Sequence, residues 1–298
     1  MNGKSLSLVL GSGGARGLAH IGVIDVLEEH GYRVESIAGS SMGAVIGGVY
    51  AMGKLDVYRD WVCALDRGDV FKLLDFSFGA PGLIKGDRIM EVMRELIGEC
   101  RIEDLPIAFT AVATDLDARR EIWIDEGPLF DAIRASVAIP TLLTPARHDG
   151  RTLVDGGLLN PVPIAPTLRD GTDLTFAVNL AGHRDPHLPV EAEEPPRPDG
   201  EPDKYRVAIQ GFVDKVTARL TDTFRDDEPE ALGMFEVLSR SFDMMQGAVS
   251  RLKLAAHHPD LLIEIPRNTC QTYEFYRARQ IIAVGRRQAE RALREFAG

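Results

Sequence analysis

The opening of the chain constrains the fold more than any other feature. Residues 6–10 form a short apolar segment that stops at a glycine-rich loop, and residues 18–30 then carry apolar side chains at helical spacing. A second short strand is expected at 36–39, followed by a helix of small and apolar residues over 42–52. The order strand, loop, helix, strand, turn, helix implies parallel strands. We therefore predict an α/β fold.

Later segments extend this pattern. Their apolar character predicts further strands at 107–114, 121–125 and 174–180. Residues 186–203, in contrast, are rich in proline and acidic side chains and nearly lack large apolar ones. Such a segment buries too little surface to offset its ordering entropy, so we expect a mobile loop there.

The C-terminal part is expected to be mainly helical. A strand at 261–265 interrupts the helical pattern, and an amphipathic, basic helix follows over about 275–296. A chain of 298 residues can bury a sizeable core without disulfides or metals. We predict one domain over 1–298, with a core at about 5–182, a mobile acidic loop at about 185–203 and a helical part at 204–298.

Charge and cysteine content argue against several classes of function. The net charge is −11 and the isoelectric point about 5.2, whereas nucleic-acid-binding proteins present a basic face. The cysteines, at 63, 100 and 270, are far apart and form no CxxC pair, which argues against a disulfide framework or structural zinc. No stretch approaches the ~18 apolar residues of a membrane span. We expect a cytoplasmic protein without a nucleic-acid partner, and peripheral contact with a membrane stays open.

Ser41 stands at the centre of a GxSxG pentapeptide that begins at Gly39 and ends at Gly43. The motif falls at the predicted turn between the second strand and the next helix, where a tight turn needs small flanking residues and exposes the central hydroxyl. The helix N-terminus also places backbone N–H groups near developing negative charge. Alone, the motif is more often a tightly packed turn, but the strand–turn–helix context favours a nucleophile.

The glycine-rich loop, residues 11–17, presents unshielded backbone N–H groups that suit an anion. A dinucleotide frame fits poorly, because the sixth residue from Gly11 is Arg16 and no acidic residue ends the second strand. The Gly-Lys-Ser/Thr of a P-loop is also missing. An oxyanion hole needs only two or three donors aimed at one oxygen, and this loop can supply them.

Asp155 begins an Asp-Gly-Gly triplet after the apolar residues 152–154. A lone triplet of this kind is usually a hairpin turn. Its interest comes from its neighbours, since an Ala-Ser-Val-Ala-Ile-Pro stretch at 135–140 ends a predicted helix upstream and Asn-Pro-Val-Pro follows at 160–163.

Together these motifs resemble the patatin-like phospholipase family. The match covers the glycine-rich loop with Arg16, the turn at Ser41, the stretch at 135–140 and the triplet at Asp155, in the family's order over about the first 180 residues. The resemblance implies a three-layer α/β/α fold with a mainly parallel central sheet. It also implies hydrolysis of lipid acyl esters through an acyl-enzyme by a Ser41–Asp155 dyad, without metal or cofactor. One departure is Ser12, where many members carry glycine.

The same resemblance implies roles for neighbouring residues. The amides of Gly13, Gly14 and Ala15 would stabilise the oxyanion. The supporting residues would be Arg16, Gly39, Gly43 and Gly156.

Two other functions are weighed against this one. A Ser–His–Asp hydrolase would place several strands before the serine and an HGGG-type segment upstream, and the chain has neither. Among the histidines, His183 remains a weak candidate base because it follows an expected strand end. The alternative outside catalysis is a catalytically weak regulatory protein that binds acyl lipids in the same pocket.

Overall fold

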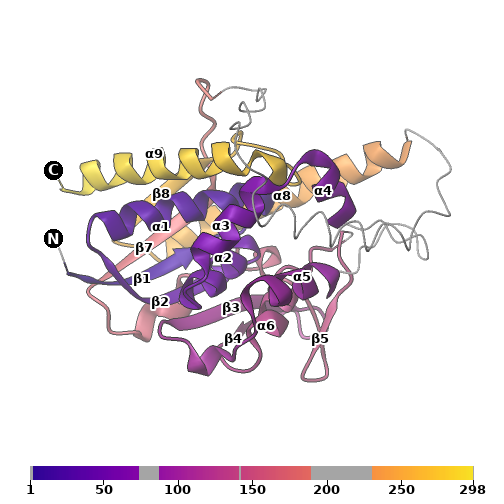
Figure 1. Ribbon diagram of the computed structural model, residues 1–298, viewed down its shortest axis with the longest axis horizontal. Coiled ribbons are helices and arrows are strands. Elements are labelled where there is room, and N and C mark those ends of the chain that lie inside the picture. The colour runs from indigo at the N-terminus through magenta and orange to yellow at the C-terminus, as the bar shows by residue number, and fades with distance from the viewer. Residues whose placement is uncertain (1–2, 74–86, 141, 189–229, 298) are drawn as a thin grey trace.

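The computed structural model describes residues 3–73, 87–140, 142–188 and 230–297, and within them eight strands form one sheet (Figure 1). The parallel part runs in the order β3 (Ala108–Asp115), β2 (Arg33–Ser40), β1 (Ser5–Leu10), β7 (Leu174–Gly182) and β8 (Leu261–Pro266). Three antiparallel strands extend the β3 edge: β4 (Arg120–Ile124), β5 (Ala146–His148) and β6 (Arg151–Asp155). The sheet is therefore mixed but mainly parallel, as expected.

Both faces of the sheet are covered, as the alternation along single strands shows. Leu8 and Val178 point into a large core, whereas their neighbours Val9 and Ala177 belong to a second, smaller cluster. Because the two sets lie on opposite faces of the sheet, helices must cover both. The three-layer α/β/α fold implied by the resemblance is thereby confirmed.

The large core lies under most of the helices. They are α1 (Ala19–Glu29), α2 (Met42–Ala51), α3 (Leu55–Ala64), α4 (Arg67–Leu73), α5 (Asp87–Ile97), α6 (Leu129–Ser136) and α9 (Ala278–Ala297). The smaller cluster packs against Leu254 of α8 (Glu230–Ala256), so α8 covers the opposite face. Among the described helices, none combines the length and the apolar composition needed to cross a bilayer.

The C-terminal part joins the same body. Strand β8 extends the sheet beside β7, and α9 lies along α1 (Figure 1). The two helices approach closely, since a Cβ at Gly22 would lie 2.1 Å from the Ile282 carbonyl oxygen and one at Gly285 would lie 2.0 Å from that of Ala19. The C-terminal strand and helix therefore pack directly on the first part of the chain, and a single domain over 1–298 stays a prediction. The expected loop at 186–203 lies, from 189 onward, outside the described residues.

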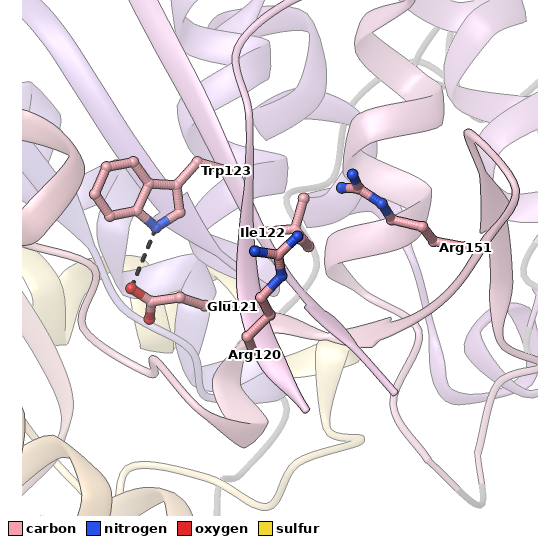
Figure 2. A pocket seen from close by; sticks show the side chains of 5 residues that line it. All are labelled: Arg120, Glu121, Ile122, Trp123 and Arg151. Atoms are coloured by element: carbon pink, nitrogen blue, oxygen red, sulfur yellow. Dashed lines mark hydrogen bonds between the residues drawn. The ribbon is translucent and has the colours of Figure 1, made fainter. Parts of the chain in front are cut away.

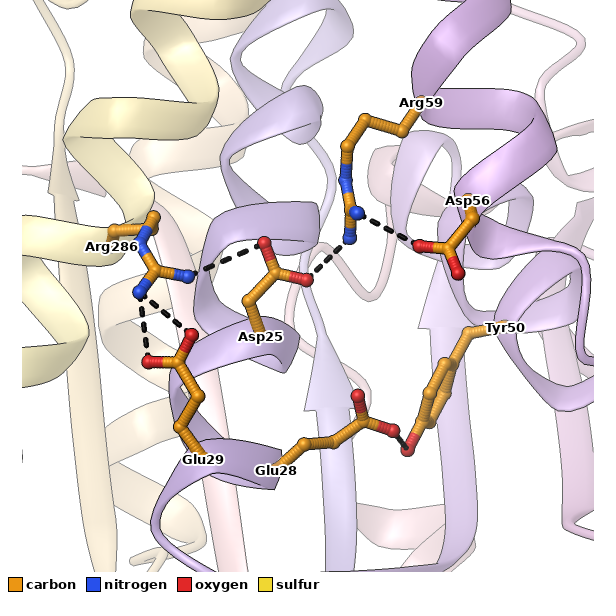
Figure 3. A network of polar contacts seen from close by, with 7 residues as sticks. All are labelled: Asp25, Glu28, Glu29, Tyr50, Asp56, Arg59 and Arg286. Carbon is orange, nitrogen blue, oxygen red and sulfur yellow. Dashed lines mark hydrogen bonds and ion pairs between the residues drawn. The ribbon is translucent and has the colours of Figure 1, made fainter.

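A polar network ties α9 to α1 and α3 on the outer surface (Figure 3). Arg286 of α9 bonds Glu29 at 2.8 Å and approaches Asp25 at 3.5 Å, while Arg59 of α3 pairs with the other oxygen of Asp25. Burial raises the pKa of Asp25, and the two guanidinium groups oppose this shift. The network fastens the helical layer at the end of α1 that lies away from the Ser41 turn.

The register along β3 brings two distant parts of the chain together. One side of β3 pairs with β4, and on the other side β2 pairs with its first half and β6 with its last three residues. Strand β2 ends at Ser40 opposite Val112, and antiparallel β6 ends at Asp155 opposite Ala113. Since both strands end at neighbouring positions on one side of β3 and run toward each other, the turn after Ser40 meets Asp155 at this junction.

Candidate active site

Ser41 forms a strained turn at the junction. It follows the last residue of β2 and precedes α2, with φ 55° and ψ −123°, a conformation that costs a non-glycine residue about 1–3 kcal/mol. Its side chain makes no capping bond to α2. The flanking glycines are required sterically, because a Cβ at Gly43 would lie 1.9 Å from the Leu10 carbonyl oxygen and one at Gly39 would lie 2.5 Å from that of Gly43. This is the geometry of a nucleophile elbow.

Asp155 lies fully buried beside this turn. Its Oδ1 accepts a hydrogen bond from the Gly157 amide at 2.7 Å, whereas Oδ2 has no partner among the described residues. Burial raises the pKa of Asp155 to about 7, and the nearby Ser41 side chain and the bond from the Gly157 amide oppose this shift. The Ser41 hydroxyl is thus close enough to affect the carboxyl group. Because Oδ2 lacks a partner at full hydrogen-bonding geometry, the two groups are neighbours without a well-aligned bond.

Two residues of the stretch at 135–140 accept hydrogen bonds from the backbone amides of Ser41 and Asp155. The Ser41 amide donates to Ser136 Oγ at 2.9 Å, and the Asp155 amide donates to the Ala138 carbonyl oxygen at 2.9 Å. The sequence identified this stretch only as part of a motif and gave Ser136 no role of its own.

One of the three backbone amides that the resemblance assigns to the oxyanion already has a hydrogen-bond partner. The Ala15 amide donates to the Thr272 carbonyl oxygen at 2.9 Å, so it is occupied. For the amides of Gly13 and Gly14 the described residues supply no acceptor. Gly14 has φ 54°, which favours glycine, and a Cβ at Gly13 would lie 2.7 Å from that of Leu180. Of the three amides that the resemblance assigns to the oxyanion, those of Gly13 and Gly14 are therefore the two without a partner among the described residues.

Arg16 braces this loop from inside the protein. Its guanidinium donates to the Gly13 carbonyl oxygen at 3.3 Å, to that of Arg267 at 3.0 Å and to Asp243 Oδ1 at 2.8 Å. Only 6% of Arg16 is exposed, and its contacts are those of a residue that supports the loop. Through Asp243, the loop is tied to α8.

A second contact from α8 reaches the same loop. Gln246 is buried and donates to Ser12 Oγ at 2.8 Å. A Cβ at Gly157 would lie 2.2 Å from Gln246 Nε2 and 2.4 Å from Ser12 Oγ, so the second glycine after Asp155 makes room for this pair. The Ser12 side chain therefore faces Gln246, a residue that sequence reasoning missed because nothing local marks it.

The histidines near these elements do not resemble a catalytic base. His20 is fully buried, and its Nε2 lies 2.9 Å from the Gly11 carbonyl oxygen, which can only accept. Burial lowers the pKa of His20 to about 4, although the bond to Gly11 opposes the shift. His183 is exposed just after β7. Within the described ranges, no group of three or more His, Cys, Asp or Glu side chains could hold a metal ion.

A shallow depression of about 440 Å³ lies on the outer strand β4, separate from Ser41 and Asp155. Its lining residues are Arg120, Glu121, Ile122, Trp123 and Arg151 (Figure 2). Figure 2 shows the two arginines on one side of β4, while Trp123 and Glu121 lie on the other and share a hydrogen bond of 3.3 Å. None of these residues belongs to the candidate site.

Comparison with known proteins connects the chain to a described family and to several relatives. The family profile "Patatin-like phospholipase" matches residues 8–168. An NTE family protein of Mycobacterium tuberculosis is 41% identical over 339 aligned residues, covering 98% of this chain and 92% of the relative. The lysophospholipase nte1 of Emericella nidulans is 33% identical over 182 residues, covering 60% of this chain and 12% of the relative. The lysophospholipase NTE1 of Yarrowia lipolytica is 31% identical over 188 residues, covering 60% and 13%.

Proposed function

The chain belongs to the patatin-like phospholipase family and is a lipid ester hydrolase, and from this premise we propose that Ser41 and Asp155 form its catalytic dyad. One observation carries the proposal: a buried carboxyl group, whose Oδ2 has no partner among the described residues, lies beside a serine held in a strained elbow. Strain of this kind concentrates at functional sites. The similarity to the relative from Mycobacterium covers 98% of this chain, so the relationship extends beyond the residues that the family profile matches.

In the proposed first step, Asp155 Oδ2 accepts the Ser41 proton while Ser41 Oγ attacks the ester carbonyl carbon. The tetrahedral intermediate collapses, the alcohol leaves with the proton from Asp155, and the acyl group stays on Ser41. General-base assistance of this kind contributes about 10²–10⁴ in rate, and it works best when the base has a pKa near the working pH. A pKa of about 7 meets that requirement.

The proposed oxyanion donors are the amides of Gly13 and Gly14, each donor being worth about 10²–10³ in rate. Ala15 would join them only after its bond to Thr272 opened. Arg16 holds the loop without facing the reacting atoms. In the second step, water gives a proton to Asp155 and attacks the acyl-enzyme, which releases the fatty acid and restores the Ser41 hydroxyl.

A fluorophosphonate probe and a lipid panel test this proposal. We expect the probe to label Ser41 covalently and the protein to release fatty acids from lipid esters, while Ser41→Ala abolishes both reactions. The matched control is Ser40→Ala, which removes the neighbouring hydroxyl, fully buried and without a partner among the described residues. It should keep labelling and turnover. A wild-type protein that binds lipids but resists the probe would instead be the regulatory protein considered above.

Peripheral contact with a membrane stays a prediction, as does a cytoplasmic location. The exposed apolar side chains of α8 offer a surface for such contact, namely Val237, Leu238, Met244, Met245 and Leu252. Sedimentation with phosphatidylcholine vesicles checks it, because charged substitutions at Met244 and Leu252 should then release the protein from the vesicles.

A further inference from the structure

We propose that Ser136 is a positioning residue that sets the Ser41 nucleophile against Asp155. The inference rests on the proposed role of Ser41. Ser136 is the last residue of α6, is fully buried and lies 95 positions from Ser41 in the sequence. It does not touch the reacting atoms; it acts through the backbone of the nucleophile.

The Ser136 hydroxyl lies between two backbone groups. Its Oγ lies 2.6 Å from the Val112 carbonyl oxygen and 2.9 Å from the Ser41 amide nitrogen. Because a carbonyl oxygen can only accept, the hydroxyl hydrogen points at Val112 and a lone pair faces the Ser41 N–H. One hydroxyl therefore satisfies a buried donor and a buried acceptor at once.

This contact extends the sheet at the point where its ladder ends. Ser40 is the last residue of β2 that pairs with β3, and its partner is Val112. Ser41 then turns away with φ 55°. The hydroxyl of Ser136 bridges the gap to Val112. A strained backbone conformation persists only where surrounding contacts hold it, and the Ser136 hydroxyl supplies one such contact at Ser41.

The same segment holds the other member of the pair. The Ala138 carbonyl oxygen accepts from the Asp155 amide at 2.9 Å, and the Asp155 carbonyl oxygen accepts from Thr114 Oγ1 at 3.1 Å. Asp155 pairs with Ala113, the residue after Val112. Ser41 and Asp155 are thus both fastened to the end of α6 and to consecutive residues of β3, and Ser136 provides the fastening on the Ser41 side.

A purely structural role is the competing explanation, and Ser7 provides the matched control. Ser7 lies in the neighbouring strand β1, is fully buried, and its hydroxyl lies 2.7 Å from Thr172 Oγ1. Ser7→Ala therefore removes the same atom from an equally buried place, in strand β1, without touching the turn.

The test compares full-length Ser136→Ala and Ser7→Ala with the wild type by two independent measurements. The first is native-state hydrogen exchange of the Ser41 amide. We expect it to be about tenfold faster in Ser136→Ala, which corresponds to the loss of one hydrogen bond, and unchanged in Ser7→Ala. The second is kcat and KM on a lipid ester. We expect kcat to fall about ten- to hundredfold in Ser136→Ala with KM nearly constant, since the nucleophile is displaced while the substrate contacts remain.

Each outcome decides the inference. Unchanged exchange at Ser41, or unchanged kcat despite faster exchange, overturns it, and so does an equal loss of kcat in Ser7→Ala. If Ser136→Ala fails to fold, Ser136→Cys replaces it, because a thiol keeps a weak donor and acceptor and should give the same pattern at reduced size. Turnover that survives in Ser41→Ala would refute the proposed function instead, and the exchange measurement would still report whether Ser136 holds the turn.

Discussion

The two strands that meet beside β3 contrast in how the chain builds its site. On the side of parallel β2, the Ser41 turn is local, since strand, glycines, serine and helix all lie within residues 33–51. On the side of antiparallel β6, Asp155 sits at the end of a short strand whose place depends on pairing with β3, some forty residues earlier. One half of the site is thus encoded by neighbouring residues and the other by the register of the sheet. Both halves are then fastened by distant contacts, the Ser41 amide to Ser136 and the Asp155 amide to Ala138.

The largest effect is expected when the carboxyl group of Asp155, at the end of β6, is replaced. Asp155→Asn should lower kcat about 10²–10⁴-fold, because the neutral amide cannot accept the serine proton. Steady-state kinetics on a lipid ester measures this loss. The matched control is Asp115→Asn. Asp115 is a buried carboxylate of β3, two residues after Ala113, the residue that pairs with Asp155, and it accepts hydrogen bonds from the amides of Asp117 and Ala118. That variant should lose stability but keep its kcat, and near-normal turnover of Asp155→Asn would remove Asp155 from the mechanism.

Glycine substitutions compare how tightly the turn after β2 and the turn after β6 are packed. A Cβ at Gly43 would lie 1.9 Å from the Leu10 carbonyl oxygen, and one at Gly156 would lie 2.0 Å from that of Val112. Each change to alanine should destabilise the protein by about 1–3 kcal/mol, because backbone atoms must move. Urea unfolding measures both.

Gly247→Ala in α8 is the control for these two variants, since its Cβ would meet Ala181 at an ordinary 3.7 Å. It should be neutral or stabilising by up to about 1 kcal/mol. Equal stability of all three variants would mean that neither side of the junction is tightly packed.

The pH dependence of turnover tests the proton transfer from Ser41 to Asp155. Asp155 must be ionised to accept the Ser41 proton, so activity should fall as pH drops through about 7. Below that value kcat/KM should fall about tenfold for each pH unit. Stopped assays between pH 5 and 9 measure the profile. A flat profile contradicts the assignment of Asp155 as base, and a profile that shifts in His183→Gln points to a histidine.

The smallest effect is expected far from the junction, in the network of Figure 3. Arg286→Gln should lower stability only slightly, because Arg286 and Glu29 both reach solvent and ion pairs of this kind contribute little. Its kcat should equal that of the wild type. Thermal unfolding at low and high salt measures the first expectation, and a reduced kcat would show that α9 influences the site more than the separation suggests.

Much of the fold was predictable because its signals are local. The strands expected at 36–39, 107–114 and 261–265 correspond to β2, β3 and β8, with bounds that differ by a few residues. Apolar runs that end at glycine mark buried parallel strands, and helical spacing marks the helices between them. Strand β5 was missed because its three residues, Ala-Arg-His, carry no apolar pattern.

The sequence alone determined the family, the α/β alternation and the candidate residues Ser41 and Asp155. These follow from short-range rules, since a tight turn or a strand end limits which side chains fit within a few positions. Only the tertiary structure decided which groups surround them. The Ser136 bridge, the Gln246–Ser12 contact and the occupied amide of Ala15 arise between segments 95, 234 and more than 250 positions apart. Such contacts depend on how the layers pack and on where along β3 each neighbouring strand ends. No local sequence pattern encodes either.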